Sequence, residues 1–176
     1  ERGGKRPCMY VPGSDVPFHS AVLRGGVAHF RTKLDERMPA EIDPAKPVGR
    51  YIPNLVARPF ELTREFAQSI LDVVPSDTVR ELLETEGAWD GALATPGVLT
   101  RTLPIELLCW QFASPARWIA TQRVLLSTAL AAPGVAGLGV DQVIQLGPGA
   151  APPLPHLPSR PLLAPPFPLH RASAFI

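Results

Sequence analysis

The distribution of proline constrains the fold of this chain more than any other feature of its sequence. The chain has 22 prolines among 176 residues, and the segment 151–176, "APPLPHLPSRPLLAPPFPLHRASAFI", contains eight of them. Proline lacks a backbone N–H and clashes with the preceding helical turn, so this segment can form neither a helix nor a central strand. We therefore expect residues 1–150 to hold the folded part, and residues 151–176 to be an irregular, extended or disordered tail or linker.

The bulk composition is that of one globular domain and excludes several functions. Hydrophobic residues make up 45% of the chain, charged residues 19%, and the net charge is +1. These values give no electrostatic basis for binding nucleic acid or a membrane surface, and no apolar run is long enough to span a membrane. The only cysteines, Cys8 and Cys109, make neither a disulfide framework nor a metal site.

The first residues, "ERGGKRPCMY", indicate where the chain is found. They are charged and glycine-rich, and they lack the apolar core of a signal peptide. They also lack an initiator methionine, so we expect the chain to be a piece of a longer protein. Together with the absence of a disulfide framework, these features predict a cytoplasmic location.

Hydrophobic periodicity predicts several helices. After His19, four apolar residues recur at steps of 4, 3 and 4, which places them on one helix face; they are Leu23, Val27, Phe30 and Leu34. Thr63 stands near the start of a further amphipathic segment, and Ser76 precedes a third segment as expected of an N-cap. A fourth helix is expected after Pro104. Ser114 followed by Pro115 predicts the start of a last helix, which should bury Trp118.

Three short strands are expected between and around these helices. They are Cys8–Val11, residues 49–57 as a short or edge strand interrupted by Pro53, and Val140–Leu146. The segment 86–97, "EGAWDGALATPG", is expected to be a loop. Strands alternating with helices predict an α/β fold, although three short strands make an incomplete sheet for a chain with so many helices.

His19, in "VPGSDVPFHS", is the first candidate for chemistry. The simplest interpretation is a histidine packed at the start of a helix. The alternative is a general base, which requires a nucleophile and an acceptor for its second ring nitrogen. The G-x-S-x-G elbow is absent from the chain. Ser14 lacks such an elbow and Ser20 is adjacent to the histidine, while both cysteines lie in apolar runs typical of inert core residues.

Four segments resemble a known family. "VPGSDVPFHS", "VGRYIPNLVARPFELTREF", "LLCWQFASPARWIATQ" and "VDQVIQLGPG" occur in the order found in the malonyl/palmitoyl transferase domain of type I fatty acid synthases of the actinobacterial and fungal kind. The resemblance covers roughly residues 1 to 150 and the C-terminal half of that domain. Shorter versions of the same blocks are similar to stand-alone malonyl-CoA:acyl carrier protein transacylases.

The resemblance implies a fold and site residues. The fold would be the C-terminal part of the acyltransferase, with an α/β-hydrolase-like core and the remnant of a ferredoxin-like subdomain. His19 matches the histidine of the family's Ser–His pair, and Gln111 matches the glutamine whose main-chain carbonyl accepts a hydrogen bond from that histidine. Asn54 matches an asparagine at a strand end, to which we assign a site-shaping, substrate-binding role. The nucleophilic serine and the malonyl-binding arginine lie upstream in the family, so Arg117 is not that arginine.

The implied reaction is a ping-pong transfer of malonyl groups, and of palmitoyl groups in the return direction, between CoA and the phosphopantetheine thiol of an acyl carrier domain. It needs no metal or redox cofactor. The implied partners are the rest of the synthase polypeptide and the carrier domain, in a large homo-oligomer, with neither nucleic acid nor a membrane. Two alternatives stay open, namely an inactive structural or interaction piece, and a half that complements an upstream half on a separate chain. The tail is either a linker to the carrier domain or an out-of-frame translation.

Overall fold

The computed structural model describes residues 16–140 of the chain. The expected strand Cys8–Val11, nearly all of Val140–Leu146 and the proline-rich segment 151–176 therefore lie outside the described residues. Within the described part, residues 16–46 and 62–116 form one compact unit, called unit 1 here, and residues 47–61 and 117–140 form a second, called unit 2.

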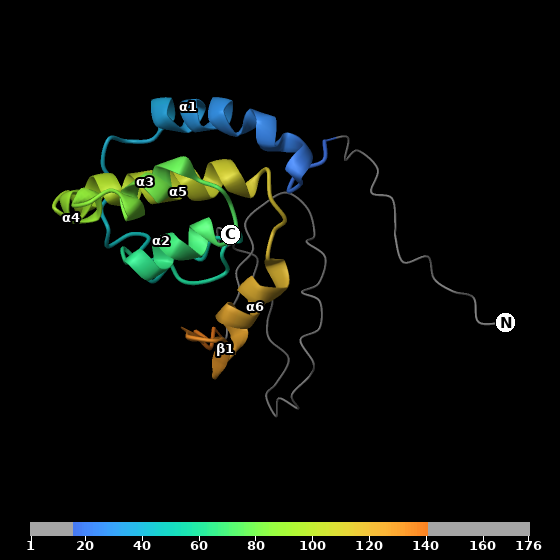
Figure 1. Cartoon of the computed structure of the whole chain (residues 1–176). Helices are drawn as coiled ribbons and strands as arrows, with labels where there is room; N and C mark the ends of the chain where they lie inside the picture. The colour runs from blue at the N-terminus through green and yellow to red at the C-terminus, as the bar shows by residue number, and fades with distance from the viewer. Residues whose placement is uncertain (1–15, 141–176) are drawn as a thin grey trace. The chain divides into compact units, whose positions relative to one another are not determined.

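Unit 1 is built from helices, and its longest helix contacts three of the others. Its elements are the 3₁₀-helix η1 (Ala21–Gly26) and the α-helices α1 (Val27–Arg37), α2 (Arg64–Leu71), α3 (Asp77–Glu84), α4 (Ala88–Leu93) and α5 (Pro96–Gln111). Helix α1 lies along α5, which also contacts α3 and α4 (Figure 1). Leu99, Leu103 and Leu107 of α5 are each at most 1% exposed. The core of unit 1 therefore centres on this helix.

Two predicted helix starts in unit 1 are confirmed. The Thr63 hydroxyl accepts a hydrogen bond from the backbone N–H of Phe66 at 3.1 Å. The Ser76 hydroxyl accepts one from the N–H of Val79 at 3.2 Å. Each hydroxyl satisfies an N–H that has no partner within its helix. Phe66 and Val79 are fully buried, so the cap and the apolar face act together to fix where each helix begins.

Three predictions in unit 1 need correction. The helix after His19 begins as the 3₁₀-helix η1 and becomes α-helical at Val27, after the flexible pair Gly25–Gly26. The expected loop 86–97 contains helix α4. Helix α5 begins at Pro96 and passes through the buried Pro104 instead of starting after it. Proline suits the first position of α5, and the buried apolar residues on both sides of Pro104 favour one continuous helix despite the missing N–H.

An ion pair between a half-buried arginine and a buried glutamate connects three helices of unit 1. Glu106 of α5 is 1% exposed. Its carboxylate accepts hydrogen bonds from the Arg31 guanidinium of α1 at 2.5 Å and 2.9 Å, and from the Ser76 hydroxyl at 2.7 Å. The hydrogen bonding of Arg31 to Glu106 is the main reason that the pKa of Arg31 is raised above its ordinary value. Because Ser76 is also the N-cap of α3, one carboxylate joins α5 to α1 and to the start of α3.

Unit 2 contains a folded loop, one helix and one hairpin. Helix α6 (Trp118–Leu126) is followed by strands β1 (Leu130–Ala132) and β2 (Val135–Ala136), which pair antiparallel. The expected strand 49–57 is wrong, because residues 54–56 form a turn. The N–H of Ala57 donates to the Pro53 carbonyl at 2.8 Å, and Ala57 has a φ of 54°. This turn reverses the chain at the proline instead of extending it.

Helix α6 begins later than the sequence predicts. Arg117, not Ser114, is the residue before the helix, and it lacks a side-chain capping bond. The backbone N–H of Arg117 donates to the Asn54 carbonyl at 2.8 Å, so a loop of unit 2 holds the chain in place where the helix starts. Trp118 is half-buried, and the buried residues are Thr121, Gln122 and Val124.

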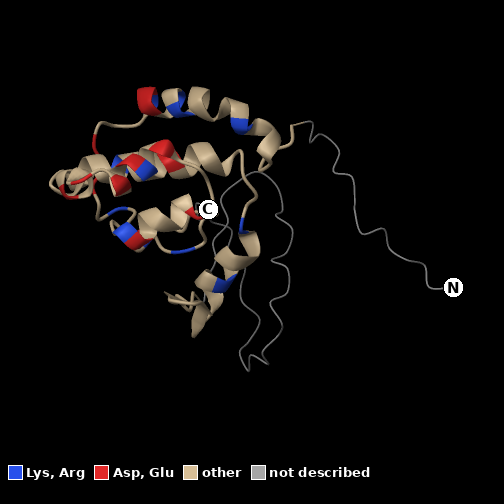
Figure 2. Ribbon diagram, in the orientation of Figure 1, with Lys and Arg blue, Asp and Glu red and all other residues tan. Residues whose placement is uncertain are grey.

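The described residues are thus mainly helical with a small two-stranded sheet, a broadly α/β arrangement. The α/β-hydrolase-like core, the ferredoxin-like remnant and the domain limits 1–150 and 151–176 stay predictions. Acidic and basic residues are interspersed over the helices of unit 1 (Figure 2). Within residues 16–140 we find no helix with the length and apolar character needed to cross a membrane.

Candidate functional site

The site centres on His19, which unit 1 holds at the C-terminal end of helix α5. The Nδ1 atom of His19 lies 2.9 Å from the main-chain oxygen of Gln111, the last residue of α5. The backbone N–H of His19 donates to the carbonyl of the next residue, Phe112, at 2.8 Å. The histidine is therefore attached to two consecutive carbonyls, one through its ring and one through its backbone.

This arrangement determines which ring nitrogen of His19 is free. A carbonyl oxygen can only accept a hydrogen bond, so Nδ1 must be the donor and carry a proton. In the neutral imidazole Nε2 then has the lone pair and can accept a proton. The side chain of His19 is exposed. The geometry thus leaves Nε2 of an exposed histidine as the base, with its tautomer fixed by the main chain.

The end of α5 is suited to this role. The last carbonyls of a helix have no partner within the helix, and Gln111 and Phe112 stand at the last and the C-cap position of α5. His19 has a φ of 59°, a conformation that residues with a Cβ rarely adopt. The two hydrogen bonds hold the histidine in this left-handed conformation, which directs its ring to the Gln111 carbonyl.

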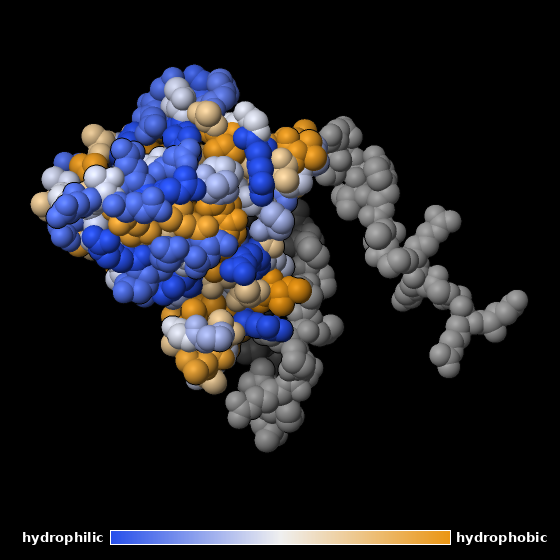
Figure 3. Space-filling view, viewed as in Figure 1, coloured by the Kyte–Doolittle hydropathy of each residue, from blue (hydrophilic) through white to orange (hydrophobic). Residues whose placement is uncertain are grey.

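Hydrophobic side chains surround His19 in the sequence and remain exposed. Val16 is 45% exposed, Phe18 62% and Val22 78%. Hydrophobic surface gathers at the η1 end of unit 1 (Figure 3). The neighbouring Ser20 directs its hydroxyl to the Pro17 carbonyl at 2.6 Å, and so it is not paired with the histidine. Ser14 lies outside the described residues.

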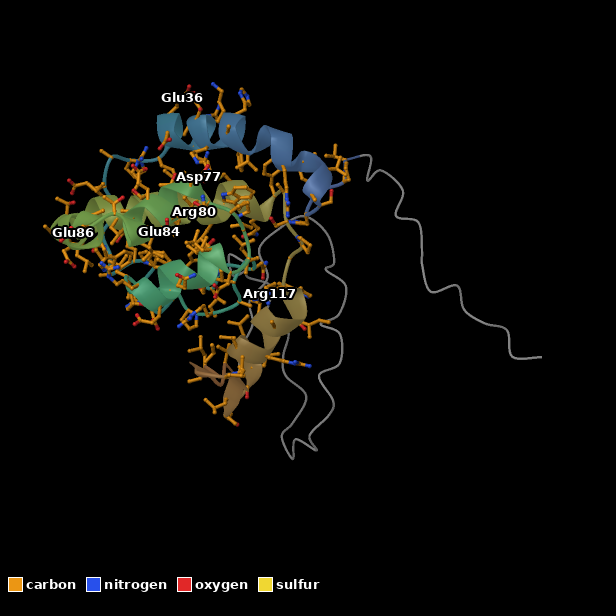
Figure 4. All side chains as sticks on the ribbon, in the orientation of Figure 1. Glu36, Asp77, Arg80, Glu84, Glu86 and Arg117 are labelled. Carbon is orange, nitrogen blue, oxygen red and sulfur yellow. The ribbon has the colours of Figure 1, made fainter. Side chains whose placement is uncertain are left out.

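The other predicted site residue, Asn54, belongs to unit 2. Its side-chain oxygen Oδ1 is buried and has no hydrogen-bond partner among the residues that the structure describes. Its main-chain carbonyl holds the N–H of Arg117, which lies at the start of α6 (Figure 4). Asn54 therefore stands in a turn, not at the end of a strand as expected. Its site-shaping role stays a prediction.

The remaining candidates do not form a second site. His29 is exposed on α1, and His156 and His170 lie outside the described residues. Among residues 16–140, no cluster of three or more His, Cys, Asp or Glu side chains could hold a metal ion. Cys109 is buried, and burial raises the pKa of its thiol from the ordinary value of 9.0 to about 12. It is an inert core residue, not a nucleophile.

The raised pKa gives a prediction for Cys109. In a Cys8→Ser background, we expect iodoacetamide at pH 8 to label Cys109 only after denaturation. Because the folded pKa lies above the unfolded one, the thiol stabilises the fold below about pH 9, and this contribution is lost as the pH rises towards about 12. Urea titrations at pH values from 8 to 11 should show that the free energy of unfolding falls less with rising pH in Cys109→Ala than in the chain that keeps Cys109. Rapid labelling without denaturant would contradict the burial.

Sequence reasoning missed two residues. Phe112, whose carbonyl holds the backbone of His19, gives no signal in the sequence apart from its position next to Gln111. Glu106 is a charged residue in the mostly apolar segment "LPIELLCW", and that contrast could have indicated a buried partner.

Comparison with known proteins finds relatives of this chain among fungal fatty acid synthases. The chain is 42% identical over 147 residues, 82% of its length, to fatty acid synthase 2 of Mycosarcoma maydis. It is 47% identical over 46% of its length to a fatty acid synthase beta subunit of Cochliobolus carbonum, and 46% identical over 43% to the fatty acid synthase subunit beta of Schizosaccharomyces pombe. The chain spans 4% of the length of each of these relatives. No protein-family model matches it.

These findings confirm the resemblance to type I fatty acid synthases. The described residues define a mainly helical protein segment in which a histidine is hydrogen-bonded to the C-terminal end of a helix. The chain is a homologue of the fungal fatty acid synthase beta subunits.

Proposed function

We propose that this chain supplies the histidine half of a Ser–His acyltransferase that serves fatty acid biosynthesis. It would move malonyl groups, and palmitoyl groups in the return direction, between CoA and the phosphopantetheine thiol of an acyl carrier domain. The observation that supports this most directly is the 2.9 Å contact between Nδ1 of His19, an exposed residue, and the Gln111 carbonyl, which leaves the lone pair on Nε2 as the base. Because the relatives are fatty acid synthases, we take the reaction of the histidine to be an acyl transfer in fatty acid biosynthesis.

In the proposed reaction, a serine from an upstream segment attacks the thioester carbonyl of malonyl-CoA while Nε2 of His19 takes the hydroxyl proton. The C–S bond then breaks, the CoA thiolate receives that proton, and the malonyl group remains as a serine ester. In the second half, Nε2 takes the proton of the carrier thiol, whose sulfur attacks the ester. The proton returns to the serine oxygen as the ester bond breaks.

The neutral carbonyl partner of His19 suits this chemistry. In the better-known triads a carboxylate holds the histidine and stabilises the imidazolium. A thiol is a good leaving group, so a weaker partner is sufficient here. Gln111 is thus a positioning residue that acts through its main chain. Asn54 is proposed to shape the site near the substrate, and the cytoplasm is the proposed location.

Reconstitution tests this proposal. We expect that mixing the chain with an upstream segment bearing the serine elbow restores transfer of radiolabelled malonyl from malonyl-CoA to a carrier domain, and that each part alone is inactive. Transfer by the isolated chain would reveal a nucleophile on the chain itself. Absence of transfer in a demonstrably assembled complex would favour the alternative, an inactive structural or interaction piece of the synthase.

A further inference from the structure

We infer that Phe112 is a positioning residue for His19, and that Gly26 is the glycine that lets the Phe112 ring take its place. This inference rests on the proposed function, since it identifies what keeps the proposed base in position. It is carried by contacts within unit 1 that join η1, α1 and the end of α5.

Phe112 contacts the histidine through its main chain and the helices through its ring. Its carbonyl accepts the backbone N–H of His19 at 2.8 Å. Its ring meets the ring of Phe30 of α1 edge to face, with centroids 5.3 Å apart and an interplanar angle of 71°. A Cβ placed on Gly26 would lie 3.2 Å from Cζ of Phe112. The ring is thus held between α1 and the Gly26 backbone.

This packing matters because Phe112 stands at the C-cap of α5. The two carbonyls that hold His19 belong to Gln111 and to Phe112 itself. Helix ends fray unless side chains or neighbouring elements fix them. Anchoring the Phe112 ring therefore fixes both carbonyls together, and with them the backbone and the ring of the histidine.

The adjacent glycine provides a matched control. Gly26 has a φ of −89° and a ψ of −8°, a right-handed conformation at the edge of the helical region, and Phe112 supplies the only atoms that a methyl group there would meet within 4 Å among the described residues. A Cβ on Gly25 would meet no atom within 4 Å. Both substitutions add the same methyl group to neighbouring positions of η1. They differ in whether that methyl group touches the ring of Phe112.

Kinetics of the reconstituted transferase give the first test. We expect Gly26→Ala to lower kcat about five-fold with little change in KM, because shifts of a fraction of an ångström at a catalytic base reduce the rate more than binding. Gly25→Ala should leave both parameters unchanged. Equal kcat in the two variants, or a change in KM alone, would overturn the inference.

A double-mutant cycle assigns the effect to the Phe112 ring. Leucine at position 112 keeps an apolar side chain but has no atom that corresponds to Cζ. We expect Phe112→Leu to lower kcat by itself, and Gly26→Ala to have no further effect in that background, since the contact is already gone. Additive losses would mean that Gly26 acts independently of Phe112, contrary to the inference.

The tautomer of His19 gives a readout that does not depend on activity. The chain has four histidines, so ¹⁵N-histidine labelling of the full chain gives few signals, and His19→Gln identifies the one of interest. We expect the Nδ1–H tautomer in the original chain and in Gly25→Ala, and a smaller population of it in Gly26→Ala. If the population of the Nδ1–H tautomer falls in this way but the original chain gives no transfer when it is assembled with the upstream segment, the proposed function fails and the positioning role stands. An unchanged tautomer in Gly26→Ala would overturn the positioning role.

Discussion

Replacing His19 with alanine is expected to lower malonyl transfer about a thousand-fold in the reconstituted transferase, within the range that a positioned general base contributes. Nε2 of His19 is the proton acceptor that the Gln111 hydrogen bond leaves available. Without it, the serine hydroxyl must lose its proton to water, and the departing thiolate must take a proton from solvent. The loss should appear in kcat and in kcat/KM equally, because the proton is shared only in the transition state.

The control for this experiment is His29→Ala. His29 is exposed on α1, so its removal changes the same residue type in the same unit. We expect transfer within two-fold of the original chain. Circular dichroism and urea denaturation of both variants would separate a loss of chemistry from a loss of folding. Transfer that survives His19→Ala in a folded chain would remove the proposed mechanism, whatever the family relationship.

Local signals in the sequence predict that helices exist in unit 1 better than they predict where each helix begins and ends. Thr63 near the start of one apolar face and the capping hydroxyl of Ser76 before another are cues that act over a few residues. The helix start expected after Pro104 is wrong because the rule that proline breaks helices is also local. The buried leucines of α5 pack against several other helices, and that tertiary packing is what carries the helix through Pro104.

The Ser114–Pro115 signal failed for a related reason. A serine followed by proline is a frequent helix start, yet α6 begins at Trp118. The N–H of Arg117 is held by the Asn54 carbonyl, which comes from a loop distant in sequence. The expected strand 49–57 failed because Pro53 and the residues after it close a turn on themselves. Neither outcome follows from propensity within a short window.

The candidate site itself could not be assembled from periodicity. His19 and Gln111 are 92 positions apart in the sequence, and nothing in either segment indicates the other. Only the family resemblance joined them, and the structure brings the two residues within hydrogen-bond distance. The second attachment, from the His19 backbone to Phe112, was not anticipated. It follows from the end of α5, where free carbonyls are a consequence of helix geometry.

The ion pair between the half-buried Arg31 and the buried Glu106 provides the largest expected effect on stability. We expect Arg31→Met to lower the free energy of unfolding by about 3 kcal/mol, since removing the arginine leaves the buried charge of Glu106 without compensation. Glu106 is 1% exposed and would keep only the Ser76 hydroxyl as a side-chain partner among those described. Urea denaturation followed by the fluorescence of the buried Trp89 and Trp110 would measure the loss.

Two further variants show whether the cost comes from the unpaired carboxylate. Arg37→Met removes an exposed cation from the same helix, and we expect it to change stability by less than about 0.5 kcal/mol. Arg31→Met combined with Glu106→Leu removes both charges and fills the space with apolar atoms, so it should recover most of the loss. Recovery is limited by Ser76, whose hydroxyl loses its acceptor while it still caps α3. If the double variant is no more stable than Arg31→Met alone, the unpaired carboxylate of Glu106 is not the source of the loss.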